Sequence, residues 1–244
     1  MSKKVIEIKN LSYVYPDGTA ALKDIALDIF EGESLGVIGP NGAGKSTLLL
    51  HLNGILRGDS QVKVFDLTVS DKALPLIRRK VGLVFQNPDN QLFMPTVFDD
   101  VAFGPINMGM DKAQVYAAVN EALKEVDMLA AIRRTSHHLS LGEKKRVSLA
   151  TVLSMSPEIL VLDEPSSDLD PKHRRDLIDI LKRLKITKIV ATHDLDLVLE
   201  VCSRVVLVDN GKLVLSGGTR DIFNNRALLE AHNLGVPSSL CRTI

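Results

Sequence analysis

The sequence has no tryptophan, three tyrosines and only two cysteines among its 244 residues. Cys202 and Cys241 lack the spacing of a metal site and do not make a disulfide framework. The first ten residues, MSKKVIEIKN, lack the apolar core of a secretory signal. No apolar run approaches the roughly 18 residues of a membrane-spanning helix. We therefore expect a cytoplasmic protein that is not embedded in a membrane, so any membrane role must come through a partner.

The chain also has no excess of charge of either sign. It carries 30 lysines and arginines against 30 aspartates and glutamates. Because a dedicated DNA- or RNA-binding protein needs a basic surface, this balance argues against a nucleic-acid partner. Hydrophobic residues make up 45% and charged residues 25% of the chain, which is ordinary for a globular protein. This length suffices for one large α/β domain or two small ones.

The order of the apolar segments predicts a mixed α/β fold that helices interrupt. In the middle of the chain, a short helical stretch is expected to end at Gly104-Pro105, and Asp111 is placed to cap a long amphipathic helix. The later stretch EILVLDE is continuously apolar, which is typical of a parallel strand covered on both faces. Asn210-Gly211 fits the type I′ turn of a hairpin. We predict a single domain with these parts: a core of about 1–89 and 156–235, a helical insertion of about 90–155, and a loosely held polar tail, 236–244.

A phosphate-binding loop follows the first buried strand. The stretch GPNGAGKST satisfies the pattern G-x-x-x-x-G-K-[ST] between a predicted strand and a predicted helix. Glycines let the backbone wrap closely around phosphates, and amides at the helix start point at the anion. We expect Lys45 to reach the β- and γ-phosphates, Ser46 to ligate Mg²⁺ and Thr47 to add a phosphate contact. A glycine-rich structural turn would not explain the full spacing with both flanking elements. The predicted nucleoside-triphosphate site comprises Gly39, Pro40, Asn41, Gly42, Ala43, Gly44, Lys45, Ser46 and Thr47.

Two acids end the apolar stretch ILVLDE. In an open α/β sheet, ligands bind at the carboxyl ends of the strands. We therefore expect Asp163 to hold Mg²⁺ through its water shell. Glu164 points elsewhere and is expected to polarise the water that attacks the γ-phosphate. The alternative is a pair of solvated acids at a strand end, and the phosphate loop argues against it.

With these motifs in order, the chain resembles the ATPase subunits of ABC (ATP-binding cassette) transporters over nearly its whole length. GPNGAGKST corresponds to the Walker A loop, ILVLDE to Walker B, LSLGE to the signature, and residues 167–170 to the D-loop. The resemblance implies a P-loop NTPase (RecA-like) core, an N-terminal antiparallel β subdomain and an inserted α-helical subdomain. It also implies that ATP and Mg²⁺ are bound and that ATP is hydrolysed.

The resemblance assigns three further residues. Gln86 corresponds to the Q-loop glutamine, which contacts Mg²⁺ and the attacking water. His193, in ATHD, corresponds to the switch histidine at the γ-phosphate. Tyr15 corresponds to the aromatic residue that stacks on adenine, although Tyr13 lies on the same face of the strand. A further pair, His137-His138, invites a metal interpretation, but two adjacent histidines without other ligands are typical of a solvated loop.

The signature LSLGE, residues 139–143, has two compatible interpretations. Ser140 and Glu143 have the spacing of a capping box at a helix start. The resemblance implies in addition that Ser140, Gly142 and Glu143 contact ATP held by a second copy in a head-to-tail dimer. Leu141 and Glu143 depart from the usual L-S-G-G-Q. Glu143 either faces phosphate and weakens the contact, or serves only the capping box. A weakly hydrolysing, nucleotide-gated regulatory subunit therefore stays open.

FQNPDNQLF, residues 85–93, resembles the ATPases of energy-coupling-factor transporters. This implies three partners: a second ATPase subunit (a homodimer or a close paralogue), a transmembrane coupling subunit and a substrate-binding membrane subunit. It also implies a peripheral place on the cytoplasmic face of the cell membrane. LSLGEKKRVSLA resembles the branch that serves cobalt or nickel uptake, and an importer of biotin or another vitamin stays open. A ribosome- or DNA-associated ABC protein fits less well, because the chain has one cassette, no long coiled-coil insertion and no basic surplus. A small-molecule kinase fits less well, because the signature and the switch histidine would have no purpose in it.

Overall fold

Alternating apolar residues at the start of the chain build an antiparallel sheet. The computed structural model describes residues 3–57 and 61–240; Cys241 lies outside this description. Ile6 and Ile8 are buried, and Lys9 beside them is exposed, as the two-residue period of a strand requires. The strand order is β2-β1-β4-β5. The strands are β1 (Lys4–Val14), β2 (Ala20–Phe30), β4 (Gln61–Val64) and β5 (Leu67–Thr68).

A second sheet aligns the carboxyl ends of five parallel strands along one edge. Its order is β10-β9-β3-β8-β7-β6, and only β10 runs antiparallel to its neighbour. The predicted hairpin turn between β9 and β10 is confirmed, because Asn210 and Gly211 have φ values of 48° and 77°. The strands are β3 (Ser34–Ile38), β6 (Val81–Val84), β7 (Ile159–Asp163), β8 (Thr187–Ala191), β9 (Arg204–Asp209) and β10 (Lys212–Gly218).

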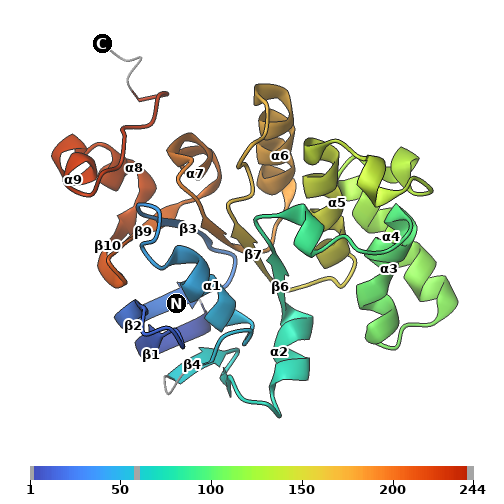
Figure 1. The fold of residues 1–244 in the computed structure, drawn as a ribbon, viewed down its shortest axis with the longest axis horizontal. Coiled ribbons are helices and arrows are strands. Elements are labelled where there is room, and N and C mark those ends of the chain that lie inside the picture. The colour runs from blue at the N-terminus through green and yellow to red at the C-terminus, as the bar shows by residue number, and fades with distance from the viewer. Residues whose placement is uncertain (1–2, 58–60, 241–244) are drawn as a thin grey trace.

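Helices cover both faces of the second sheet (Figure 1). Along β7, Ile159 and Val161 belong to the cluster shared with α1 and the first sheet, whereas Leu160 and Leu162 pack toward the helices on the opposite face. This explains why the β7 sequence is apolar without a break. The helices outside the middle of the chain are α1 (Lys45–Leu52), α2 (Leu74–Lys80), α6 (Pro171–Arg183), α7 (Leu195–Val201), α8 (Thr219–Phe223) and α9 (Arg226–Ala231).

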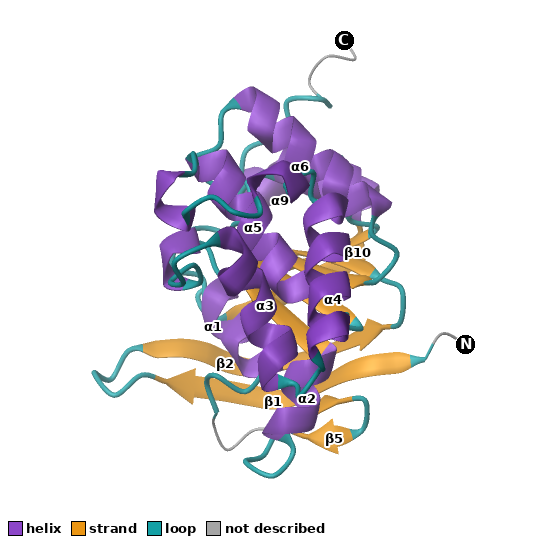
Figure 2. Cartoon of the chain, turned by 90° about the vertical axis from the view of Figure 1, so that its right-hand side faces the viewer, coloured by secondary structure: helices purple, strands orange, loops and turns teal. Residues whose placement is uncertain are grey.

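The middle of the chain folds into three packed helices, as the sequence predicts (Figure 2). Asp111 caps α4 in a reciprocal box with Gln114. The mixed α/β fold with an inserted helical part is therefore confirmed. The elements of this part are the 3₁₀ turn η1 (Pro88–Asn90), the helices α3 (Val97–Asn107) and α4 (Lys112–Glu125), the 3₁₀ turns η2 (Leu129–Ala131) and η3 (Ser136–His138), and the helix α5 (Leu141–Leu153).

The predicted helix end at Gly104-Pro105 is wrong. α3 continues to Asn107 with Pro105 inside it. A proline has no amide to donate to the carbonyl four residues earlier, here that of Val101. The buried hydroxyl of Ser154 donates to this carbonyl instead, at 2.9 Å. A tertiary contact thus satisfies the group that the proline leaves free, and the local sequence gives no sign of it.

The described part of the polar tail is held more firmly than we expected. The Asp196 carboxylate accepts hydrogen bonds from the amides and hydroxyls of Ser238 and Ser239. Burial raises the pKa of Asp196, but these four hydrogen bonds outweigh it and hold the value at about 2. The carboxylate therefore stays ionised, and the tail up to Leu240 packs on the helical side of the core.

Ser154→Ala should lower the free energy of unfolding by about 1–3 kcal/mol, because it leaves the Val101 carbonyl without its donor. In a Pro105→Ala background the new amide can bond that carbonyl, so the same substitution should cost less. Chemical denaturation of the wild type, both single variants and the double variant measures the difference. Equal costs in the two backgrounds would contradict this function of Ser154.

Candidate functional site

The phosphate loop joins β3 to α1 at the carboxyl edge of the second sheet. Gly39 and Gly44 have φ values of 151° and 103°, which favour glycine. A side chain at Gly39 would collide with the carbonyl of Val208, and one at Gly44 with the carbonyl of Ala21. The glycines therefore let the loop lie tightly against its neighbours. The first amides of α1 have no partner within the helix and are available to an anion.

Lys45 places a buried ammonium group on this loop. Its side chain is 7% exposed, and Nζ donates to the carbonyls of Gly39 at 2.8 Å and Pro40 at 3.1 Å. Burial lowers the pKa of Lys45, while the negative charges of Glu164 and Asp163 partly offset the effect. The Glu164 carboxylate lies 3.9 Å from Nζ. A phosphate group would offer this desolvated cation stronger acceptors than two carbonyls.

Asp163 has the properties of a magnesium ligand. It lies at the end of β7, where the Ser46 hydroxyl donates to its carboxylate. Burial raises the pKa of Asp163, and this hydrogen bond opposes the rise. Among the described residues, its buried Oδ1 atom has no hydrogen-bond partner. Carboxylate, hydroxyl and amide oxygens are hard donors, so Asp163, Ser46 and Gln86 fit Mg²⁺ bound together with phosphates.

Glu164 follows Asp163 in a left-handed backbone conformation, with φ of 43°. This conformation is sparsely populated for a side chain of this size and turns Glu164 away from the direction of the strand. Its Oε2 atom accepts from the Thr192 hydroxyl at 2.9 Å and from the His193 amide at 3.3 Å. The Nδ1 atom of His193 lies 2.9 Å from the same oxygen. The glutamate and the histidine therefore form a pair at the ends of β7 and β8.

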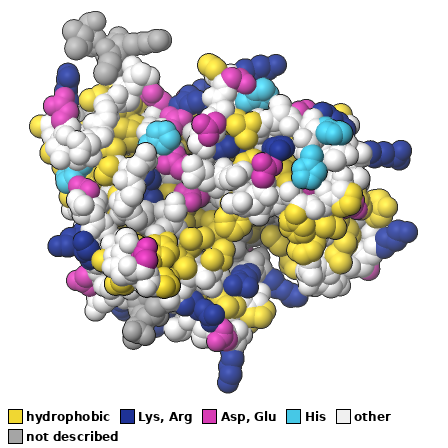
Figure 3. Space-filling model, viewed as in Figure 1, with side chains coloured by type: hydrophobic (Ala, Val, Ile, Leu, Met, Phe, Trp, Pro, Cys, Tyr) yellow, Lys and Arg dark blue, Asp and Glu magenta, His cyan; other side chains and the backbone are white. Residues whose placement is uncertain are grey.

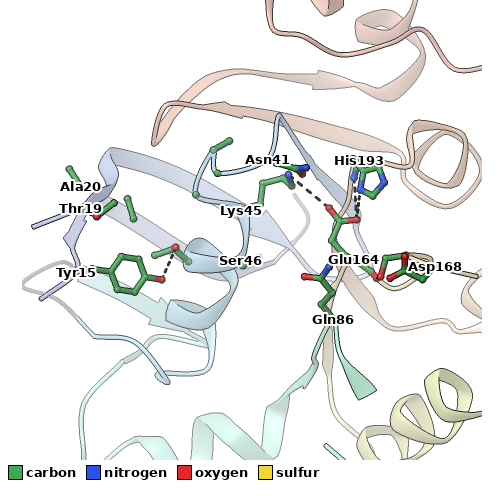
Figure 4. A pocket seen from close by; sticks show the side chains of 16 residues that line it. Tyr15, Thr19, Ala20, Asn41, Lys45, Ser46, Gln86, Glu164, Asp168 and His193 are labelled. Carbon is green, nitrogen blue, oxygen red and sulfur yellow. Dashed lines mark hydrogen bonds and ion pairs between the residues drawn. The ribbon is translucent and has the colours of Figure 1, made fainter. Parts of the chain in front are cut away.

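Most of the predicted site residues line one cavity of about 600 Å³ (Figure 4). Lys45, Glu164 and His193 lie close together there, and Tyr15 lies on the far side of the loop. This volume suits a nucleotide-sized ligand. The predicted residues that line the cavity are Tyr15, Asn41, Gly42, Ala43, Gly44, Lys45, Ser46, Thr47, Gln86, Glu164 and His193.

The residues at the Tyr15 end of the cavity were only partly predicted. The Tyr15 hydroxyl lies 3.0 Å from Thr47 Oγ1, and its ring meets the edge of Tyr13. Tyr13 packs against His51 and is not part of the cavity lining, so the structure places Tyr15 at the cavity, as the family register implies. The cavity also includes residues 19–21, at the start of β2, which the sequence analysis missed. The turn that follows Tyr15 brings residues 19–21 beside it, and this turn in the sequence could have indicated that they share its site.

The signature residues do not line this cavity. Ser140 and Glu143 form the predicted capping box at the start of α5, which is confirmed. Glu143 is bound by the Ser140 amide at 2.8 Å and by Arg134 at 2.8 Å. Gly142 packs so closely on the His173 ring that a side chain there would displace the ring. Gly39, Pro40 and Asp163 are not among the residues that line the cavity, but each contacts one that does.

The remaining metal candidate can be set aside. His137 and His138 are exposed in η3. Within residues 3–57 and 61–240, no group of three or more His, Cys, Asp or Glu side chains is arranged to hold a metal ion. The Mg²⁺ site inferred above does not need such a group, because it would combine one carboxylate, that of Asp163, with the Ser46 hydroxyl, the Gln86 amide oxygen and phosphates.

The sheet order, the phosphate loop and this cavity define a P-loop nucleotide-binding fold. The family model described as ABC transporter matches residues 22–167. A protein of Geobacter sulfurreducens, provisionally named an ABC transporter ATP-binding protein, is 52% identical over 98% of this chain and 97% of its own. The chain belongs to the ABC transporter family of ATP-binding proteins, as an ATPase of the energy-coupling-factor type.

Two further comparisons support this assignment. The energy-coupling factor transporter ATP-binding protein EcfA of Carboxydothermus hydrogenoformans is 49% identical over 95% of this chain and 87% of its own. The structure of CbiO1 from Clostridium perfringens, part of the ABC transporter complex CbiONQ, has a TM-score of 0.83 and 38% identity, covering 96% of each chain. Among the described residues, no helix has the length and apolar character needed to cross a membrane.

Lys45→Met should raise the Kd for ATP by roughly 10- to 100-fold, since a hydrogen bond to a charged group contributes about 1.5–3 kcal/mol. The melting temperature without nucleotide, measured in parallel, separates a loss of affinity from a loss of folding. Titration with a fluorescent ATP analogue measures the affinity. Lys23→Met, on the exposed side of β2, is the control. Unchanged affinity in Lys45→Met would exclude Lys45 from phosphate binding.

Proposed function

We propose that this chain is the ATPase subunit of an energy-coupling-factor importer for cobalt or nickel ions and that it works as a head-to-tail dimer. The dimer proposal depends on the observation that only some of the predicted site residues line the cavity. Lys45, Glu164 and His193 line the cavity, whereas the exposed Ser140 and the neighbouring Gly142 do not. A second copy that brings the start of its α5 to this cavity completes the contacts of one ATP molecule.

Within one copy, the positions of the side chains support their roles. Tyr15 offers its ring to adenine, and Lys45 exchanges its two carbonyl acceptors for phosphate oxygens. Glu164 accepts a hydrogen bond from the attacking water and takes its proton, while His193 contacts the γ-phosphate. Ser46, Gln86 and Asp163 would hold Mg²⁺. When bound, this ion neutralises the charge on the phosphates.

The start of α5 supplies the second half of the site. The Ser140 hydroxyl accepts from the Glu143 amide, which leaves the Gly142 amide and the helix dipole for a phosphate on the partner copy. The hydrogen bond from the Ser140 amide, supported by Arg134, lowers the pKa of Glu143 despite its partial burial. These contacts favour the interpretation that Glu143 stabilises the helix start and does not face phosphate.

A second cavity, of about 730 Å³, is the proposed docking groove for the transmembrane subunit. It lies between α2, the Q-loop and α3, and Figure 3 shows apolar side chains gathered over this part of the molecule. Phe93 and Phe103 meet edge to face at its wall, and each is about half exposed. Arg78 and Arg79 add positive charge. An amphipathic coupling helix with an acidic flank fits a groove of this chemistry.

The solute assignment rests on resemblance. LSLGEKKRVSLA is similar to the cobalt and nickel branch, and the likeness to CbiO1 supports that placement. The ATPase does not touch the solute, which is recognised by the membrane partners. Docking at the groove would hold the chain on the cytoplasmic face of the membrane.

Glu164→Gln should lower kcat by roughly 10²-fold or more, because the amide cannot take a proton from water. ATP binding should persist, so that a closed dimer accumulates. Light scattering of this variant with saturating ATP, compared with the nucleotide-free variant, measures the dimer. Hydrolysis at the wild-type rate would remove Glu164 from its proposed role, and monomers at saturating ATP would overturn the dimer.

Vesicles containing the chain and its co-purified membrane subunits test the importer. Radiolabelled cobalt or nickel should enter when ATP is supplied, and Lys45→Met should abolish this uptake. ATP-driven entry of biotin without either metal would overturn the solute assignment and leave the ATPase assignment standing.

A further inference from the structure

A buried lysine from the inserted helices contacts the backbone of the catalytic turn. Lys145 lies in α5 and is 7% exposed. Its Nζ atom donates to the carbonyl oxygen of Glu164 at 3.0 Å and to Ser167 Oγ at 2.8 Å. Lys145 does not line the nucleotide cavity. It is therefore placed to act on Glu164 without touching the nucleotide.

The turn that Lys145 contacts has an unfavourable backbone conformation. Glu164 is left-handed, as is Asp168 four residues later. The Glu164 carbonyl also accepts from the Ser167 hydroxyl at 2.9 Å and from the Ser167 amide at 3.2 Å. A sparsely populated conformation persists only where its surroundings hold it. Of the donors to this carbonyl, the ammonium group of Lys145 is the one that comes from another part of the fold.

Stability alone gives no reason for a lysine at this position. Burial lowers the pKa of Lys145, and the charges of Asp168, Glu164 and Asp163 only partly offset this effect. An apolar side chain of similar length would fill the same space without the desolvation of a charge. The Glu164 carbonyl would still have both donors from Ser167. What only the lysine provides is a charged hydrogen bond that fixes the position of this carbonyl.

We propose that Lys145 is a positioning residue for Glu164. By holding the Glu164 carbonyl, it fixes the left-handed turn and directs the carboxylate to the water beside the γ-phosphate. This inference rests on the proposed role of Glu164 as the proton acceptor. An error of about 1 Å in the placement of a reacting group can cost roughly 100-fold in rate, so a contact to its backbone can govern kcat.

Lys145→Met tests this role in the purified full-length chain. We expect kcat for Mg²⁺-dependent ATP hydrolysis to fall roughly 10- to 100-fold while KM for ATP stays within about twofold, because Lys145 itself does not line the nucleotide cavity. The melting temperature should not fall. Lys145→Arg keeps a cationic donor and should restore part of kcat. The matched control is Lys144→Met on the same helix, which loses only a surface pair with Asp89 and should change kcat by less than about twofold.

A double-variant cycle separates positioning from a general structural effect. If Lys145 acts through the Glu164 carboxylate, adding Lys145→Met to Glu164→Gln should lower the residual hydrolysis of radiolabelled ATP by less than about threefold. An equal loss in both backgrounds, a rise in KM that accounts for the effect, or a kcat loss accompanied by a lower melting temperature would overturn the inference. If the proposed role of Glu164 is itself wrong, the result is different, because Glu164→Gln alone would then hydrolyse ATP at the wild-type rate.

Discussion

Two buried ammonium groups, from separate parts of the fold, contact the glutamate that follows β7. Glu164 contacts both: its carboxylate is 3.9 Å from Lys45 Nζ, and its carbonyl is 3.0 Å from Lys145 Nζ. Each lysine is costly to bury alone, and the acids at the end of β7 reduce that cost. One cation belongs to the phosphate loop and the other to the inserted helices. The position of Glu164 therefore depends on both parts of the fold.

Helix α5 connects this charge cluster to the groove beside the Q-loop. Lys145 contacts the Glu164 turn, and within the next two turns Gln91 binds the same helix, donating to the Ser148 carbonyl at 2.8 Å and to Thr151 Oγ1 at 2.6 Å. The carbonyl of the Gln91 side chain accepts from the Phe85 amide, next to Gln86 in the chain. A short helix behaves as a stiff unit because its backbone is hydrogen-bonded throughout. The groove and the Glu164 turn thus share one rigid support.

The sequence predicted those features whose cause is local. The phosphate loop, the Asp111 cap, the hairpin turn at Asn210 and the capping box at Ser140 all depend on residues a few positions apart. The continuous apolar character of β7 likewise indicated a parallel strand covered on both faces. The strands and helices are also recognised from local patterns, so their order along the chain predicted the fold class.

The features that the sequence could not predict depend on distant partners. α3 passes through Pro105 because Ser154, about fifty residues away, supplies a donor. Residues 19–21 enter the cavity because the first hairpin folds over the phosphate loop. The contact of Lys145 with Glu164 required the inserted helices to be placed against β7, and no spacing pattern records it.

Neighbouring groups of the same chain also explain how the signature can carry a carboxylate at position 143. A carboxylate at position 143 would repel phosphate if it were free at the helix start. Arg134 and the Ser140 amide instead bind it on the side of its own chain, where it also interacts favourably with the helix dipole. Because Arg134 neutralises much of its charge, Glu143 leaves the Gly142 amide usable by an anion. The substitution of glutamine by glutamate is therefore compatible with an active composite site, provided that Arg134 stays in place.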